Sequence, residues 1–186
     1  MQDVAQGFAG AVNELSQVAP RLDRDQIAAF MQAIVGAKRV FLIGAGREGL
    51  ATRAFAMRLT HLGKETRWIW DDTTPAIGAG DLLIATSGSG AIGHIDYVFD
   101  QAVAAGASTA VVTGDPTGAT ARKARTLLWL PAAVYKGKAE VVPSSQPMGN
   151  LFEQALFILF DQIAISLVEK LGTTPAAMSA RHRNVE

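Results

Sequence analysis

The residues best suited to chemistry form a serine-glycine turn, Ser87-Gly88-Ser89-Gly90, which follows a short apolar strand predicted at 81–86. A helix is predicted after the turn, so two hydroxyls and unhindered backbone N–H groups lie near a helix N-terminus. The partial positive charge there favours an anion, and glycines let the backbone approach it closely. Because Ser-Gly pairs are also common turn formers, a purely structural role is the alternative. The pattern favours phosphate binding.

A carboxyl group on a long apolar helix predicted at 150–171 is the candidate acid or base. On a helical wheel Glu153 shares its face with apolar side chains: Phe157, Phe160, Ala164 and Leu167. A carboxyl group on such a face is desolvated unless it is paired or lines a cavity, and desolvation moves its pKa toward the range useful for proton transfer. The alternative is a capping box, in which Asn150 is the N-cap and Glu153 bonds backbone donors. The local pattern does not separate the two.

The three histidines match no metal-ligand spacing, so no metal site is predicted. His61 lies among apolar residues of a helix predicted at 49–62, where it either takes part in chemistry or fills a core position near the helix C-terminus. His94 begins a helix, and His182 lies in the tail. No GxSxG motif is present, which argues against a Ser-His-Asp hydrolase.

The composition indicates one globular domain over residues 1–186, since 49% of the residues are hydrophobic and only 18% are charged. Basic and acidic residues both number 17, so no basic surface indicates nucleic-acid binding. The chain has no cysteine, which excludes disulfides and is compatible with the cytoplasm. No signal peptide is recognised, and polar residues interrupt the longest apolar segment, 151–171, so no membrane span is expected.

Strands and helices alternate along most of the chain. The strands are predicted at 39–43, 65–70, 81–86, 108–113 and 126–131, and the helices at 4–18, 23–35, 49–62, 91–105, 116–124, 150–171 and from Thr174-Pro175 onward. The strands are apolar without strict alternation, as in a sheet covered on both faces. The expected fold is a three-layer α/β/α sandwich with a five-stranded parallel sheet. N-terminal helices (1–36) precede the α/β core and a lid-like loop (37–148), and C-terminal helices (149–186) follow.

A GxGxxG motif at Gly44-Ala45-Gly46-Arg47-Glu48-Gly49 follows the first predicted strand. In a parallel sheet this loop lies at the edge where ligands bind. A dinucleotide-binding fold is therefore an alternative, with Asp71 or Asp72 after the second strand as the ribose-binding acid. A lone GxGxxG is weak support, and the chain leaves little room for a catalytic domain beside such a fold.

Taken together, these segments resemble the sugar isomerase (SIS) domain family and, within it, the 6-phospho-3-hexuloisomerases. The resemblance rests on the order and spacing of seven segments: 44–47, 56–63, 73–77, 80–84, 87–90, 149–154 and 181–186. It covers the chain from about the first helix to the C-terminus. It implies a flavodoxin-like topology and a cytoplasmic enzyme that interconverts a 3-ketohexose 6-phosphate and fructose 6-phosphate, without metal or organic cofactor. It also implies a homo-oligomer, with a tetramer favoured over a dimer.

The resemblance assigns roles to particular residues. It implies that the phosphate is held by residues of the two glycine-rich loops: Gly46, Arg47, Ser87, Gly88, Ser89 and Gly90. Glu153 would be the acid and base, and His61 and His182 would assist proton movements on the sugar oxygens, His182 at a neighbouring subunit's site. One carboxyl group can serve both proton transfers through an enediol, while donors stabilise the developing oxyanion.

Two departures from the family pattern concern the phosphate site. The family continues its first loop as Gly-Arg-Ser-Gly, whereas this chain has Glu48 in place of the serine. A threonine that follows the Ser-Gly-Ser-Gly turn in the family is missing, since Ala91-Ile92 stands there. Both changes weaken the phosphate site unless Glu48 pairs with Arg47 or Arg53 and turns away. A non-catalytic sugar-phosphate-binding or regulatory module is therefore the alternative to an isomerase.

Overall fold

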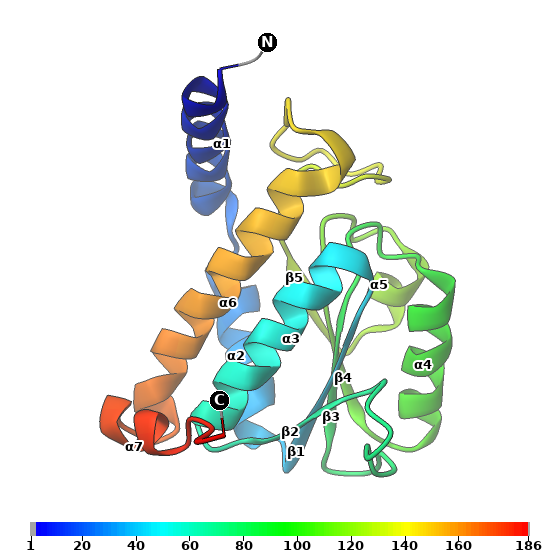
Figure 1. Ribbon diagram of the computed structural model, residues 1–186. Coiled ribbons are helices and arrows are strands. Elements are labelled where there is room, and N and C mark those ends of the chain that lie inside the picture. The colour runs from blue at the N-terminus through cyan, green and yellow to red at the C-terminus, as the bar shows by residue number, and fades with distance from the viewer. Residues whose placement is uncertain (1–2, 186) are drawn as a thin grey trace.

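The computed structural model describes residues 3–185 and is built around a five-stranded sheet (Figure 1). The strands lie in the order β2-β1-β3-β4-β5, and all neighbours are parallel. In chain order they are β1 (Arg39–Gly44), β2 (Glu65–Trp68), β3 (Leu82–Thr86), β4 (Ser108–Thr113) and β5 (Thr126–Trp129). The strand order reverses between β1 and β3, and ligands of open parallel sheets bind beyond the carboxyl ends of the strands at such a point.

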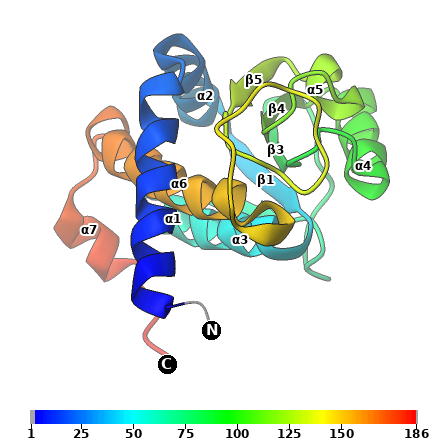
Figure 2. The ribbon, with the colours of Figure 1, turned by 90° about the horizontal axis from the view of Figure 1, so that it is seen from above.

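Helices cover both faces of the sheet, as Figures 1 and 2 show. On one face lie α2 (Arg24–Gly36), α3 (Gly46–His61) and α6 (Asn150–Lys170), and on the other α4 (Gly93–Ala104) and α5 (Ala119–Lys123). The helix α1 (Val4–Val18) packs on α6 away from the sheet, and α7 (Pro175–Ala180) lies near the C-terminal end of α3. The predicted three-layer sandwich with a parallel sheet is confirmed.

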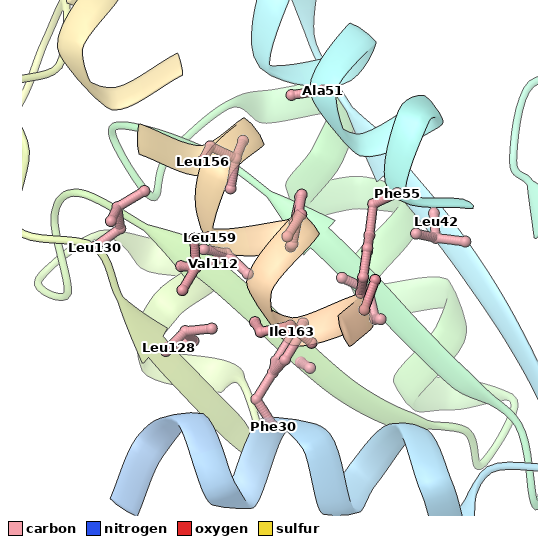
Figure 3. Packing of buried hydrophobic residues seen from close by; sticks show 14 of the residues in the cluster. Phe30, Leu42, Ala51, Phe55, Val112, Leu128, Leu130, Leu156, Leu159 and Ile163 are labelled. Atoms are coloured by element: carbon pink, nitrogen blue, oxygen red, sulfur yellow. The ribbon is translucent and has the colours of Figure 1, made fainter. Parts of the chain in front are cut away.

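Alternate strand residues contribute to two apolar clusters, one on each face of the sheet. Leu42 of β1 packs toward α2, α3 and α6, whereas its neighbour Phe41 packs toward α4. The larger cluster includes Phe30 of α2 and Phe55 of α3 (Figure 3). The rings of Phe55 and Phe160 stack with centroids 4.2 Å apart, which joins α3 to α6. Burial on both faces explains why the strands read as continuous apolar runs.

The predicted elements are all present, with shifted ends. The helix predicted at 49–62 begins three residues earlier, at Gly46, because residues 46–49 form its first turn and not a loop. A Cβ on Gly49 would lie 2.6 Å from the carbonyl oxygen of Gly44, so this glycine allows α3 to cross β1 closely. The helix predicted from residue 91 begins at Gly93, since residue 92 is extended. Residues 69–81, all of them described, contain no helix, as predicted.

The segment Pro147–Lys170, which includes α6, is long and apolar enough by composition to cross a membrane. Half of its apolar window is buried inside the domain, where α6 packs along α3. Core helices of soluble proteins have the same property, so this helix is weak support for a membrane span. Its amino-terminal end lies at the sheet edge where the carboxyl ends of β1 and β3 meet (Figure 1).

Candidate active site

A pocket of about 290 Å³ opens beyond the carboxyl ends of β1 and β3. Four segments line it: the start of α3 (45–48), the serine-glycine turn (88–89) with residue 92, the loop before α6 (134–136 and 148–149), and the start of α6 (152–153). The first turn of α3 contributes the positive end of a helix dipole, which favours an anion. The pocket therefore joins the anion-binding turn and the candidate acid of the sequence prediction.

Within the serine-glycine turn the four predicted residues have different positions. Gly88 and Ser89 line the pocket. Ser87 is buried, and among the described residues its hydroxyl oxygen has no hydrogen-bond partner. Gly90 has φ +64° and donates its N–H to the carbonyl oxygen of Ser87, 2.9 Å away, so it closes the turn. Gly88 and Ser89 are thus placed to contact a ligand, while Gly90 shapes the backbone.

Glu153 lies at the wall of the pocket and is paired with Arg47. Its Oε2 accepts a hydrogen bond from Nε of Arg47 at 2.5 Å, and 17% of its side chain is exposed. The alternative capping box is wrong, because the N-cap of α6 is Gly149 with φ +81° and no side chain caps the helix. The carboxylate of Glu153 therefore does not cap α6. It faces the pocket beside the guanidinium group of Arg47.

Glu48 points toward the serine-glycine turn, so the condition under which the phosphate site would not be weakened, an arginine partner that turns Glu48 away, is not met. Its Oε2 accepts a hydrogen bond from the backbone N–H of Gly88 at 2.7 Å. Arg47 is paired with Glu153, and Arg53 lies 3.5 Å from Asp71. Burial raises the pKa of Glu48 from 4.5 to about 7; the bond from Gly88 opposes this, and the charge of Glu153 adds to it.

The loop that forms the outer wall is held at both ends. The backbone N–H of Lys138 donates to the buried carboxylate of Asp115 at 2.7 Å. Farther along, Glu14 of α1 accepts hydrogen bonds from Ser144 and Ser145 at 2.6 to 2.8 Å and from Nε2 of Gln146 at 2.9 Å. These contacts place Tyr135 and Lys136 at the pocket.

The sequence missed the anchors of this loop, because Asp115 and Glu14 meet it across long stretches of chain. The available signal was the predicted lid-like loop itself, in which Lys136 and Lys138 flank Gly137 and precede two prolines. It did not show which of its residues face the pocket.

The structure brings His61 and His182 together but not to this pocket. Their ring centroids are 5.3 Å apart at the C-terminal end of α3. Burial lowers the pKa of His61, and the nearby charges of His182, Arg58 and Arg183 lower it further. The 16-residue helix α3 is about 24 Å long, and Arg47 stands at its other end. Within one chain the two histidines are therefore remote from Glu153.

Neither aspartate of the dinucleotide alternative lines the pocket. Asp71 forms its ion pair with Arg53, and both Asp71 and Asp72 are exposed. Two glycines of the GxGxxG motif, Gly44 and Gly49, instead allow the close crossing of β1 and α3. The acidic residues that follow the second strand are thus not placed to hold a ribose in this pocket.

Known proteins of similar sequence show the family to which the chain belongs. The 3-hexulose-6-phosphate isomerase of Mycobacterium gastri is 36% identical over 184 residues, which are 99% of this chain and 92% of that protein. The chain belongs to the 3-hexulose-6-phosphate isomerase family. The 3-hexulose-6-phosphate isomerase of Bacillus subtilis is 30% identical, with 96% of both chains covered. No family model matches the sequence.

Solved structures support the same family fold. A protein from Methanococcus jannaschii, for which the function of 3-hexulose-6-phosphate isomerase has been inferred, has a TM-score of 0.84 and 26% identity, with 97% of this chain and 99% of that chain covered. The sugar isomerase domain of an RpiR transcription factor from Sphaerobacter thermophilus shares the fold with a TM-score of 0.75 at 18% identity, with 100% and 98% covered. Membership of this family favours a phosphosugar isomerase over a dinucleotide-binding protein or a non-catalytic module.

Proposed function

We propose that this member of the 3-hexulose-6-phosphate isomerase family interconverts a 3-hexulose 6-phosphate and fructose 6-phosphate in the pocket between α3, α6 and the serine-glycine turn. The observation that carries the proposal is that Glu153 and the turn line one pocket. An isomerase of phosphosugars needs an acid-base group and a phosphate-binding site that lie within the length of one substrate molecule of each other. The relatives named 3-hexulose-6-phosphate isomerase support the choice of sugar, and the shared pocket supports the choice of site.

The phosphate is proposed to bind between the first turn of α3 and Ser89. The helix dipole, the backbone of Gly46 and the hydroxyl of Ser89 favour the anion, and Lys136 brings a positive charge to the opposite wall. A phosphate held away from the reacting carbons positions them, which is a large part of the rate enhancement in enzymes.

The chemistry is proposed to run through an enediol. Glu153 takes the proton from C2 of the 3-hexulose, which leaves a double bond between C2 and C3. The proton is then returned to C3 while the O2 hydroxyl proton moves to O3, and fructose 6-phosphate results. Arg47, which bonds Glu153, holds the carboxylate in place and adds positive charge where the oxyanion develops.

The histidine pair is proposed to act at the site of a neighbouring subunit, because within one chain it lies at the far end of α3. An apolar surface on the outer helices is available for contact between subunits. Large apolar side chains of α1, α3 and α6 are about half or more exposed: Val4, Phe8, Val12, Leu50, Met57, Phe157, Ile158 and Ile165. We propose a homo-oligomer, with a tetramer favoured over a dimer, and a location in the cytoplasm, with which a chain without cysteine is compatible.

Turnover of defined sugars tests the proposed reaction. The protein is incubated with 3-hexulose 6-phosphate, fructose 6-phosphate, other phosphorylated ketoses and aldoses, and unphosphorylated fructose. We expect interconversion of the first two and no conversion of free fructose. Absence of turnover with every phosphorylated sugar would overturn the proposal.

Mixing two inactive variants tests the shared site. Glu153→Gln and His182→Ala are each purified, then dissociated and reassembled together. If the histidine of one chain serves the carboxylate of another, mixed oligomers contain some sites with both groups intact and regain part of the activity. Recovery no greater than the sum of the two variants alone would show that His182 does not act across subunits.

A further inference from the structure

A carboxyl group of the protein itself lies in the proposed phosphate-binding site. The Gly88 N–H points at Oε2 of Glu48 at 2.7 Å, so a backbone donor of the serine-glycine turn is taken by a carboxyl group. The hydroxyl of Ser87, the residue before, has no partner within the described chain. A phosphate oxygen that accepts a hydrogen bond from the Gly88 N–H must either displace Glu48 or lie beside its protonated, neutral carboxyl group.

Glu48 is held in this position by its surroundings. The hydroxyl of Thr52 donates to the carbonyl oxygen of Glu48 at 2.7 Å and lies 2.7 Å from the hydroxyl of Thr86, which fixes the first turn of α3 against the end of β3. A Cβ on Gly88 would meet Val134 at 3.1 Å and Oε2 of Glu48 at 3.3 Å, so the carboxyl lies in a narrow space under the loop. Glu48 is therefore placed between the serine-glycine turn and the loop.

We infer that Glu48 is a proton-dependent gate for the phosphate: the ester binds when the Glu48 carboxyl is neutral and is repelled when it is ionised. The neutral carboxyl donates its O–H to a phosphate oxygen, whereas the carboxylate competes for the Gly88 N–H and repels the dianion. No covalent bond changes. Binding of the phosphate dianion is accompanied by uptake of one proton at Glu48 when the pH lies above the pKa of that group.

The charges that face Glu48 agree with this assignment. Glu153 of α6 lies across the pocket, and its negative charge disfavours a second carboxylate. Arg47 on the same helix is engaged by Glu153. The loop contributes Tyr135 and Lys136, and the turn contributes no titratable group. Burial and Glu153 together raise the pKa of Glu48 to about 7, so its charge changes in the physiological range.

The inference deepens the proposed function, since it concerns how that same site recognises its phosphate. The test is calorimetric binding of fructose 6-phosphate and, separately, of inorganic sulfate, which remains a dianion throughout, between pH 6.5 and 9. Wild type is compared with Glu48→Gln, which keeps the shape and cannot ionise, and with Glu48→Ser, which removes the carboxyl. Glu140→Gln, an exposed residue of the loop, is the matched control.

For the wild type and the Glu140→Gln variant we expect the dissociation constant of each anion to rise about 50-fold from pH 7 to pH 9, as follows for one group of pKa about 7 that must be protonated. Both Glu48 variants should show a nearly flat profile and bind more tightly than wild type at pH 9. Proton uptake, measured in buffers of different ionisation enthalpy, should approach one in wild type and vanish in both variants.

Equal profiles in wild type and both Glu48 variants would overturn the gate, because the pH dependence would then belong to another group. Sulfate binding that depends on Glu48 without any binding of fructose 6-phosphate would keep the gate and overturn the proposed reaction. Failure of the wild type and of both variants to bind either anion would overturn both.

Discussion

The pKa of Glu48 leads to a measurable effect on stability. Its folded-state pKa of about 7 lies above the ordinary value of 4.5, so the neutral carboxyl is favoured by the fold. The stabilising contribution of the neutral form is complete below pH 4.5 and is lost as the pH rises to 7, after which it stays lost. A shift of this size corresponds to about 3 kcal/mol, as an upper value. Glu48→Gln removes the ionisation while keeping an acceptor for the Gly88 N–H.

We therefore expect Glu48→Gln and wild type to differ little near pH 5 and the variant to be more stable at pH 8, by up to about 3 kcal/mol. For a chain of this length that is about 6–12 °C in melting temperature. Denaturant and thermal unfolding at fixed protomer concentration measure the difference, and Glu169→Gln, an exposed carboxyl on α6, is the control. A stability difference that is the same at pH 5 and pH 8 would refute the argument that burial keeps Glu48 neutral.

Two further perturbations test the packing and the loop. Phe160→Ala removes a buried ring stacked on Phe55 and should cost about 3–5 kcal/mol in unfolding free energy, whereas Tyr97→Ala, exposed on α4, should change it little. Glu14→Ala removes the acceptor of the loop hydrogen bonds. It should raise KM several-fold with a smaller change in kcat, and it should speed tryptic cleavage after Lys136. Unchanged cleavage and an unchanged KM would show that Glu14 does not hold the loop.

The pH dependence of the Glu14 contacts has the opposite sign to that of Glu48. Burial raises the pKa of Glu14, but the hydrogen bonds from Gln146, Ser144 and Ser145 outweigh it and lower the pKa from 4.5 to about 2. The stabilising contribution of these bonds is therefore present above pH 4.5 and is lost as the pH falls toward 2.

The sequence was sufficient for the fold because the local patterns agreed with one another. Doubly buried strands give continuous apolar runs, and the connections between them are long enough for crossover helices except at 69–81. One error in the helix ends lies at the glycine-rich segment 46–49. Its residue types favour a loop, but it forms the first turn of α3, and the absent side chain of Gly49 is needed for the crossing of α3 over Gly44.

The site was only partly predictable. The turn and Glu153 follow from residue types and helical periodicity, and the structure places both at one pocket. The partner of Glu153 did not follow, because Arg47 meets it across 106 residues of chain. The direction of Glu48 did not follow either, since the choice between an arginine and the Gly88 N–H depends on how α3 sits over β3. That His61 lies far from the pocket could not be predicted either, because it depends on the direction in which α3 runs through the fold.

The central claim is that Glu153 moves a proton between adjacent carbons of a phosphosugar bound at the serine-glycine turn. Nuclear magnetic resonance of fructose 6-phosphate in D₂O with the enzyme tests it most directly, because the proposed enediol exchanges the hydrogen on C3 with solvent. We predict that wild type incorporates deuterium at C3 and that Glu153→Gln does so about 10²–10⁴-fold more slowly while still binding the sugar phosphate. Exchange at an undiminished rate in Glu153→Gln would contradict the account.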